Sequence, residues 1–260
     1  MTDTIAANIY DYPTYYDLIF GSDWRAEFGF LSTCFDTYAT GQVKRLFEPA
    51  CGTGRLLYRF SKAGYSVCGL DLNERAVAFC NQRLRKQGFP ETAFVADMSD
   101  FTLKHKVDAA FNTINSFRHL LSEKQATAHL RCVAAALRKG GIYVLGFHLT
   151  PTAGVTTDNE SWSAQRGQLC VNTRMWTTSR DLKLREERCA MTFDVHTPTK
   201  YLQLQDEIVF RTYTAPQLKA LLKRVPELDL IAIHDFAYDT DDEVPITSET
   251  EDVVLILRKK

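Results

Sequence analysis

Residues 43–71, VKRLFEPACGTGRLLYRFSKAGYSVCGLD, constrain the fold of this chain more than any other stretch. An apolar run ending at Glu48 predicts a strand, and a loop of small residues, 50–54, separates this strand from a helical pattern. Residues 66–70 predict a second strand, and Asp71 follows at its end. A glycine loop between strand and helix, with a carboxylate at the tip of the next strand, is typical of a nucleoside-binding α/β protein.

The residue types in this stretch suit that chemistry. Gly52 and Gly54 can adopt positive φ and bring the backbone close to a ligand. Such a ligand would meet backbone amides and the positive end of a helix dipole, which favour a carboxylate or a phosphate. Asp71 can accept hydrogen bonds from the two hydroxyls of a ribose. The stretch therefore predicts a nucleoside site but does not by itself say which nucleoside binds.

The glycine spacing separates two families of nucleotide-binding protein. A dinucleotide fingerprint, G-x-G-x-x-G, needs a third glycine where this chain has Leu57, which disfavours a nicotinamide-dependent dehydrogenase. Residues 48–54, EPACGTG, instead closely resemble the first motif of the class I S-adenosylmethionine-dependent methyltransferases, with Ala50 in place of the usual first glycine. The resemblance implies S-adenosylmethionine as cofactor and the following contacts: Glu48, Ala50, Cys51, Gly52, Thr53, Gly54, Asp71 and Leu72.

Later segments support this resemblance. Asp97 and Met98 follow a short predicted strand, at the position where the family supplies an acidic side chain and a backbone amide to the adenine. The loop 112–120 follows another strand and should lie at the carboxyl ends of the strands, where ligands bind. Asn112 is expected to shape this loop and to join the cofactor-binding set. Residues 137–144, LRKGGIYV, resemble the L-K-P-G-G segment of the family.

Strands and helices alternate as far as residue 149, which predicts a parallel sheet. A capping box at residues 122–125 should open a helix that runs through Leu137 and stops at Gly140-Gly141, followed by a strand over 142–149. Residues 228–236 and 252–257 look like the antiparallel strands that close a methyltransferase sheet. The predicted fold is α/β, a doubly wound, mostly parallel seven-stranded sheet of the Rossmann-like methyltransferase type.

The chain is expected to have three parts, of which the core contains this sheet. Residues 1–42 are rich in aromatic side chains at helical spacing and predict an N-terminal helical cover. Residues 43–149 and 214–260 form the cofactor-binding core. Period-two patterns between 169 and 214 predict an antiparallel β meander inserted over 150–213, with a turn at residues 197–200.

Candidate catalytic side chains lie in the cover and in the loop after the strand 107–111. Tyr10 and Tyr16 resemble a tyrosine segment that lies across the cofactor in the family, although core packing also explains them. Phe117, Arg118 and His119 should lie near the reacting methyl group. A nucleophile that must lose a proton needs a base, for which His119 is the first candidate and His148 the second. A thiol or a neutral amine would need no base.

Composition limits the partners. The formal net charge of −1 provides no basic field for nucleic acid. The seven cysteines are scattered, without a C-x-x-C pair or a zinc-site spacing, so we expect no metal and a reducing compartment. No apolar run is long enough to cross a membrane, and the N-terminus does not resemble a leader, which favours a cytoplasmic protein.

Residues 235–252 contain eight acidic side chains and neither Lys nor Arg, which indicates a solvated loop or a flap for a cationic substrate.

We therefore expect a methyltransferase that moves a methyl group to a nitrogen or oxygen of a small-molecule acceptor, with an amine as one candidate. A non-catalytic module that binds the cofactor is the alternative, because methyl transfer demands no particular side chain. The sequence leaves a homodimer open.

Overall fold

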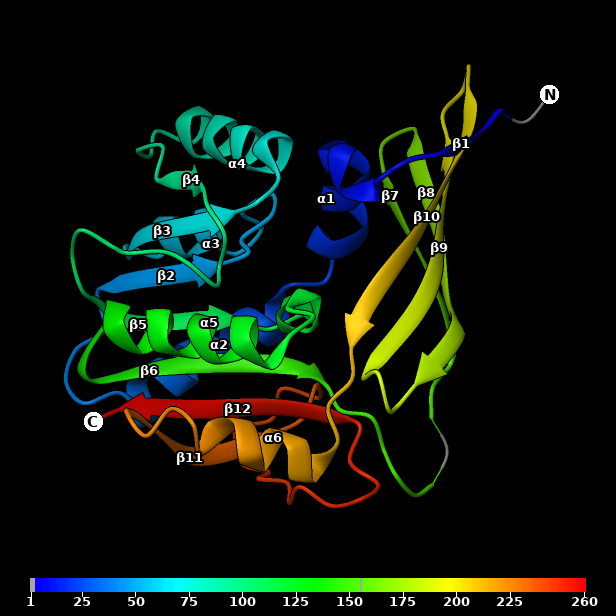
Figure 1. The fold of residues 1–260 in the computed structure, drawn as a ribbon. Helices are drawn as coiled ribbons and strands as arrows, with labels where there is room; N and C mark the ends of the chain where they lie inside the picture. Colours follow the sequence, from blue (N-terminus) through cyan, green and yellow to red (C-terminus); the bar gives the residue numbers. More distant parts are fainter. Residues whose placement is uncertain (1–2, 155) are drawn as a thin grey trace.

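Two β-sheets face each other across the N-terminal helical segment (Figure 1). The computed structural model describes residues 3–154 and 156–260. The larger sheet has seven strands in the order β11-β12-β6-β5-β2-β3-β4, and the smaller has five in the order β1-β10-β9-β8-β7. No helix of the described residues is both long and apolar enough to cross a membrane.

The larger sheet confirms the predicted fold class. Its strands are β2 (Arg45–Pro49), β3 (Ser66–Asp71), β4 (Ala93–Val95), β5 (Val107–Asn112), β6 (Leu137–His148), β11 (Leu228–His234) and β12 (Asp252–Lys259). β2 pairs in parallel with both β3 and β5, whereas β12 pairs antiparallel with β6 and β11. The chain moves outward from β2 through β3 to β4 and then returns to β5. The strand order therefore reverses between β2 and β5, where a doubly wound sheet binds its ligand.

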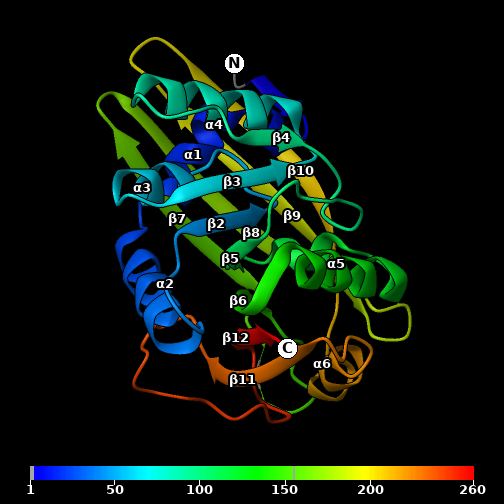
Figure 2. The ribbon, with the colours of Figure 1, turned by 90° about the vertical axis from the view of Figure 1, so that its left-hand side faces the viewer.

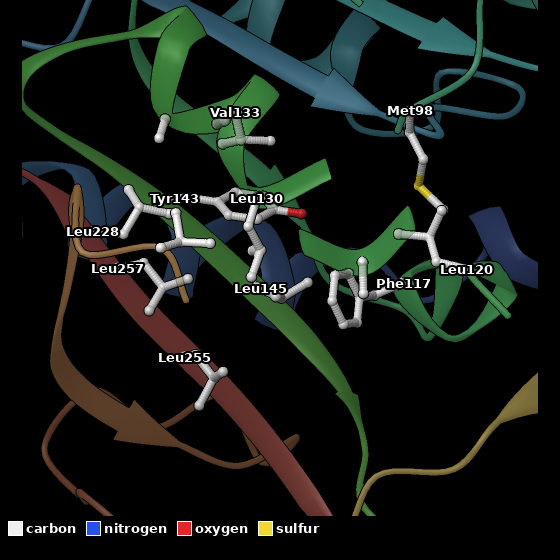
Figure 3. Packing of buried hydrophobic residues seen from close by; sticks show 14 of the residues in the cluster. Met98, Phe117, Leu120, Leu130, Val133, Tyr143, Leu145, Leu228, Leu255 and Leu257 are labelled. Carbon is white, nitrogen blue, oxygen red and sulfur yellow. The ribbon is translucent and has the colours of Figure 1, made fainter. Parts of the chain in front are cut away.

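Helices cover both faces of this sheet (Figure 2). They are α2 (Arg25–Tyr38), α3 (Leu57–Lys62), α4 (Glu74–Lys86), α5 (Glu123–Ala136) and α6 (Ala215–Leu222). Apolar residues of α2, α3 and α4 form one buried cluster with the sheet, and those of α5 and α6 form another on the opposite face. In the second cluster, Leu130 and Val133 of α5 face Tyr143 and Leu145 of β6 (Figure 3). The two clusters fix the sheet from both sides.

The boundary between α5 and β6 differs from the prediction. The capping box at Ser122 is present, but α5 ends at Ala136 and β6 begins at the next residue. A Cβ on Gly140 would lie 2.6 Å from Thr40 Cβ, and a Cβ on Gly141 would lie 2.7 Å from the carbonyl oxygen of Asp108. The prediction that these glycines stop the helix is wrong, because they lie within β6 and allow close packing there.

The smaller sheet contains the predicted meander and one strand that was not predicted. β7 (Asn159–Arg166), β8 (Leu169–Asp181), β9 (Glu186–His196) and β10 (Tyr201–Arg211) pair antiparallel in sequence order, with a turn at residues 197–200. β1 (Asp3–Ala6) pairs in parallel with β10. The predicted helical cover over residues 1–42 did not include β1, because a strand of four residues is too short for its periodicity to be recognised.

The N-terminal segment continues between the sheets through a short 3-10 helix, η1 (Ile9–Asp11), and the helix α1 (Pro13–Gly21). Ile9, Leu18 and Ile19 are buried in one cluster with the inner face of the smaller sheet. Asp17, on the same helix, is also buried but contacts the glycine loop. The segment thus joins the smaller sheet to the switch point of the larger one.

Candidate active site

The glycine loop connects β2 to α3 and turns sharply at three residues. Ala50, Gly52 and Gly54 have φ values of 53°, 52° and 66°. A Cβ on Gly54 would lie 2.2 Å from Cys80 Sγ, whereas a Cβ on Gly52 would have only Tyr16 nearby, at 3.8 Å. Gly54 is therefore needed for packing against α4. The space beside Gly52 is open on the side of the cover, whereas the space beside Gly54 is filled by Cys80.

Two predicted cofactor contacts in this loop have side chains that point elsewhere. Cys51 is buried, and its sulfur would lie 2.8 Å from a Cβ on Gly69, so it packs against β3. Thr53 is also buried and donates its hydroxyl to Asp17 at 3.0 Å. Only the backbone of these two residues can therefore face a ligand at the loop.

Ala50 occupies a left-handed conformation that disfavours any residue with a Cβ. Replacing it by glycine should raise the free energy of unfolding by about 0.5–1 kcal/mol, since relief of the backbone exceeds the added entropy of the unfolded chain. Urea denaturation of the two proteins measures this difference. A loss of stability in Ala50→Gly would show that the alanine methyl group contributes packing that outweighs the backbone cost.

Asp71, at the end of β3, holds the loop in place. Its two carboxylate oxygens accept hydrogen bonds from the backbone amides of Gly52 and Asn73, each at 2.8 Å. Burial raises the pKa of this carboxyl group, and the amide hydrogen bonds oppose that rise. Each oxygen keeps a further lone pair for a hydroxyl donor. Leu72 beside it is 68% exposed, which is unusual for a leucine and leaves an apolar surface at the strand end.

Two buried oxygens at the ends of neighbouring strands lack a hydrogen-bond donor among the described residues. They are Glu48 Oε2 of β2 and Asn112 Oδ1 of β5. Burial raises the pKa of Glu48 well above its usual value, although Arg55 partly opposes this. Asn112 donates its amide nitrogen to the carbonyl of Pro49 at 2.6 Å. Its amide nitrogen therefore ties the end of β5 to the start of the glycine loop, and its oxygen stays available to a ligand.

The segment after β4 is fixed by a histidine that the sequence analysis did not identify. Asp97 Oδ1 accepts hydrogen bonds from the backbone amide and the hydroxyl of Ser99, at 2.7 and 2.8 Å. The side chain of Met98 packs in the core towards Leu120 (Figure 3). The carbonyl of Met98 lies 2.9 Å from Nδ1 of His129, so Nδ1 donates to it. A lone histidine within an apolar helix gave no signal of this role.

His129 is fully buried on α5 and connects this segment to the sheet. Its Nε2 lies 2.8 Å from the hydroxyl of Tyr143 and accepts a hydrogen bond from it, since Nδ1 is the protonated nitrogen. Burial lowers the pKa of His129 to about 4, so the ring is neutral at neutral pH. The position of Met98 is thereby tied to the middle of β6.

The N-terminal segment is fastened over the glycine loop by buried polar contacts. Asp17 accepts the Thr53 hydroxyl and pairs with Arg83 of α4 at 2.5 Å. Asn73, which follows β3, donates its side-chain amide to Asp11 at 2.7 Å. These contacts hold the segment against both ends of the predicted nucleoside site.

The three predicted catalytic side chains come together although His119 is far in sequence from Tyr10 and Tyr16. The hydroxyl of Tyr10 lies 3.1 Å from Nε2 of His119, at the end of the 3-10 helix η2 (Ser116–His119). The rings of Tyr10 and Tyr16 lie 5.3 Å apart, and the ring of His119 lies 5.0 Å from that of Phe210 in β10. The cover, the loop after β5 and the smaller sheet therefore meet at His119.

The protonation of this cluster follows from its burial. Burial lowers the pKa of His119 to about 4, and the neighbouring Arg118 acts in the same direction. Burial also raises the pKa values of Tyr10 and Tyr16, and the nearby Asp71 contributes to both shifts. All three side chains are accordingly uncharged at neutral pH, so they can orient a polar group without adding charge.

The second candidate base, His148, has a different environment. Its Nδ1 lies 2.6 Å from a carboxylate oxygen of Asp252, and both residues line a cleft between the end of β6 and the smaller sheet. The sequence gives no sign of this cleft, because its walls come from segments that become neighbours only in the fold. No group of three or more His, Cys, Asp or Glu side chains in 3–154 and 156–260 is arranged to hold a metal ion.

A sheet of this strand order, with a glycine loop and a strand-end carboxylate at its switch point, defines the class I methyltransferase fold. Residues 47–141 match the family described as "Methyltransferase domain". This match covers the part of the chain that contains the glycine loop, Asp71 and Asp97, and it supports the resemblance to the S-adenosylmethionine-dependent methyltransferases.

Known proteins resemble this chain in sequence and in fold. A dTDP-3-amino-3,4,6-trideoxy-alpha-D-glucopyranose N,N-dimethyltransferase of Streptomyces venezuelae is 29% identical over 52% of this chain and 56% of its own length. An S-adenosylmethionine-dependent methyltransferase from Clostridium acetobutylicum has a TM-score of 0.77 at 17% identity, covering 97% of this chain and 99% of its own. An amino pentose methyltransferase from Micromonospora echinaspora, with S-adenosylmethionine bound, has a TM-score of 0.71 at 18% identity, covering 98% and 99%.

The sequence matches are partial, and the structural matches concern the fold. The chain spans about half the length of the first two curated relatives it matches, 56% and 46%. The residues at the switch point, where the strand order reverses, suit S-adenosylmethionine as the cofactor. A methionyl ammonium group is a donor for the unpartnered oxygens of Glu48 and Asn112, and ribose hydroxyls are donors for the free lone pairs of Asp71.

Proposed function

We propose that this protein transfers the methyl group of S-adenosylmethionine to a nitrogen atom of a small-molecule amine. The observation that carries the proposal is the contact between Tyr10 and His119, next to the glycine loop and beneath the N-terminal cover. Two segments far apart in sequence, the N-terminal cover and the loop after β5, thus present uncharged polar groups at one point. Such an arrangement suits the orientation of a neutral nucleophile in an enclosed site.

Nitrogen is proposed rather than oxygen for two reasons. The names of two similar proteins specify methyl transfer to an amino sugar, an N,N-dimethyltransferase and an amino pentose methyltransferase. In addition, a neutral amine carries its own lone pair, whereas a hydroxyl must lose its proton to a base with a suitable pKa. With its pKa lowered to about 4, His119 is poorly suited to deprotonate a hydroxyl.

The bound cofactor supplies a methyl group already activated on a sulfonium. The residues of the chain hold and align the reactants. In this proposal Asp71 binds the ribose, Glu48 and Asn112 bind the methionyl ammonium, and Asp97 with the Met98 backbone binds the adenine. The His119 imidazole accepts a hydrogen bond from an N–H of the acceptor, and Tyr10 fixes the ring. Such alignment can supply roughly 7–11 kcal/mol of the barrier in well-oriented reactions.

Replacing His119 by alanine should misplace the acceptor nitrogen and lower kcat for an amine acceptor by about 100-fold, with the Kd of S-adenosylmethionine unchanged within about twofold. A steady-state assay of S-adenosylhomocysteine release, together with calorimetric titration of the cofactor, measures both quantities. Tyr10→Phe is the matched variant, because it removes only the hydroxyl that contacts the ring and should cost about tenfold or less. An unaffected kcat in His119→Ala would remove His119 from the reaction.

The pH dependence of the wild type gives a second readout. Because His119 is neutral above a pH of about 4, its titration should not limit the rate near pH 6.5. The acidic limb of kcat/KM should instead follow protonation of the amine and shift between acceptors of different pKa. An acidic limb near 6.5 that is the same for all acceptors would contradict this assignment.

A further inference from the structure

The cleft between the end of β6 and the smaller sheet is open to solvent, and its space, counted together with the solvent at its mouth, is about 690 Å³. One wall consists of the end of β6, the following residues and the start of β12, and the other consists of β7, β8, β9 and β10. Arg118 and Phe210, both buried, are among its lining residues. Because His119 follows Arg118 and packs on Phe210, the cleft adjoins the residues proposed to hold the acceptor nitrogen.

The cleft is acidic. Two arginines and His148 line it together with five carboxylates: Asp158, Glu160, Glu187, Glu251 and Asp252. Both arginines are already paired, since Arg118 and Arg180 each contact the buried carboxylate of Glu187, and Arg180 also contacts Asp158 at 2.8 Å. Lysine is absent from the lining that the structure describes. The guanidinium groups are therefore not free to bind a phosphate.

The carboxylates on the outer part of the cleft are less well compensated. Glu160 is half-buried and makes no ion pair with any residue that the structure describes. Glu251 accepts hydrogen bonds from the amide and the hydroxyl of Thr157, both at 3.1 Å, but no cation contacts it within 3–154 and 156–260. Asp252 faces only His148. A cationic group in the cleft would meet free acceptor oxygens, whereas an anion would meet net negative charge.

We infer that the cleft is the acceptor subsite and that it binds an acceptor with a second cationic amine and without a nucleoside diphosphate. This inference rests on the proposed function for the reacting nitrogen and adds the class of the remaining molecule. The second amine binds beside Glu160 and Glu251, and the reacting amine reaches His119 past Phe210. The acceptor is thereby distinguished from the dTDP-linked amino sugar in the name of the Streptomyces venezuelae relative.

Three probes test the assignment on the full-length protein saturated with S-adenosylhomocysteine: a monoamino hexose glycoside, the matching diamino hexose glycoside, and the same monoamino hexose linked to thymidine diphosphate. Calorimetry should give a Kd for the diamino probe at least tenfold lower than for either of the others. The double variant Glu160→Gln/Glu251→Gln should reduce that preference to less than threefold. Asp241→Asn, a change on the exposed acidic loop away from the cleft lining, should leave it intact.

The outcomes separate the two proposals. Tightest binding of the thymidine diphosphate-linked probe, or a preference for the diamino probe that survives in Glu160→Gln/Glu251→Gln, would overturn the assignment of the cleft, even if amines are methylated. Tight, carboxylate-dependent binding of the diamino probe without release of S-adenosylhomocysteine in turnover assays would support the cleft but contradict the proposed methyl transfer. Cofactor titration of the double variant, with a Kd within about twofold of the wild type, excludes a general loss of structure.

Discussion

Replacing Asp71 by alanine is expected to weaken the binding of S-adenosylmethionine by at least about 100-fold. The change removes the acceptor proposed for two ribose hydroxyls, and hydrogen bonds to a charged group contribute about 1.5–3 kcal/mol each. It also releases the backbone amides of Gly52 and Asn73, which both donate to this carboxylate at 2.8 Å. Isothermal titration with S-adenosylmethionine and S-adenosylhomocysteine measures the loss.

A matched pair of variants separates binding from folding in this experiment. Asp71→Asn keeps the shape but places one amide nitrogen against a backbone N–H, so its affinity should lie between that of the wild type and that of Asp71→Ala. Asp229→Ala, on the exposed edge strand β11, removes a carboxylate that pairs only with Lys260 and should leave the Kd unchanged. An affinity of Asp71→Ala within threefold of the wild type would show that the ribose binds elsewhere.

Replacing Gly54 by alanine should destabilise the protein by about 3 kcal/mol or more. The new Cβ would lie 2.2 Å from the buried sulfur of Cys80, and the φ of 66° is a further cost for any residue but glycine. Because Cys80 lies in α4, the clash would push this helix away from the glycine loop. The midpoint of urea denaturation should fall accordingly, and the binding of S-adenosylmethionine should weaken with it.

A double-mutant cycle identifies the cause of this loss. Cys80→Ala removes the sulfur and leaves a contact of 3.2 Å between the new Cβ and Cys80 Cβ, so in the Gly54→Ala background it should restore about 2 kcal/mol. Alone, Cys80→Ala should destabilise by about 1 kcal/mol through loss of buried volume. Strict additivity of the two changes would mean that the cost of Gly54→Ala comes from the backbone alone.

The sequence predicted the fold well where short-range patterns determine it. The spacing from Glu48 to Gly54 and the carboxylate after the next strand identify a nucleoside loop, because strand, turn and helix are encoded by adjacent residues. The different surroundings of the two glycines in this loop could not be predicted from the sequence. Gly52 and Gly54 look equivalent in the sequence, but Cys80 lies against one and Tyr16 near the other, and neither neighbour is local.

The other differences between the prediction and the structure also arise from neighbours that are distant in the sequence. At the junction of α5 and β6, Gly140 and Gly141 resemble a helix stop, but the reason for them lies at Thr40 and Asp108. The meeting of Tyr10 with His119 could be suspected from the positions of their segments, whereas the pKa of His119 depends on burial that only the fold creates. The acidic cleft combines the end of β6 with strands of the meander and has no signature in any single segment.

The pairing of β1 with β10 determines when the site can be completed during synthesis. The hydroxyl of Thr4 donates to the side chain of Gln203 across 199 positions of the chain, so β1 must wait for β10, the last strand of the smaller sheet in sequence. Until then the glycine loop and its strands can form, but the cover has no sheet to rest on. A nascent chain thus acquires its glycine loop well before it acquires the strand on which the N-terminal cover rests.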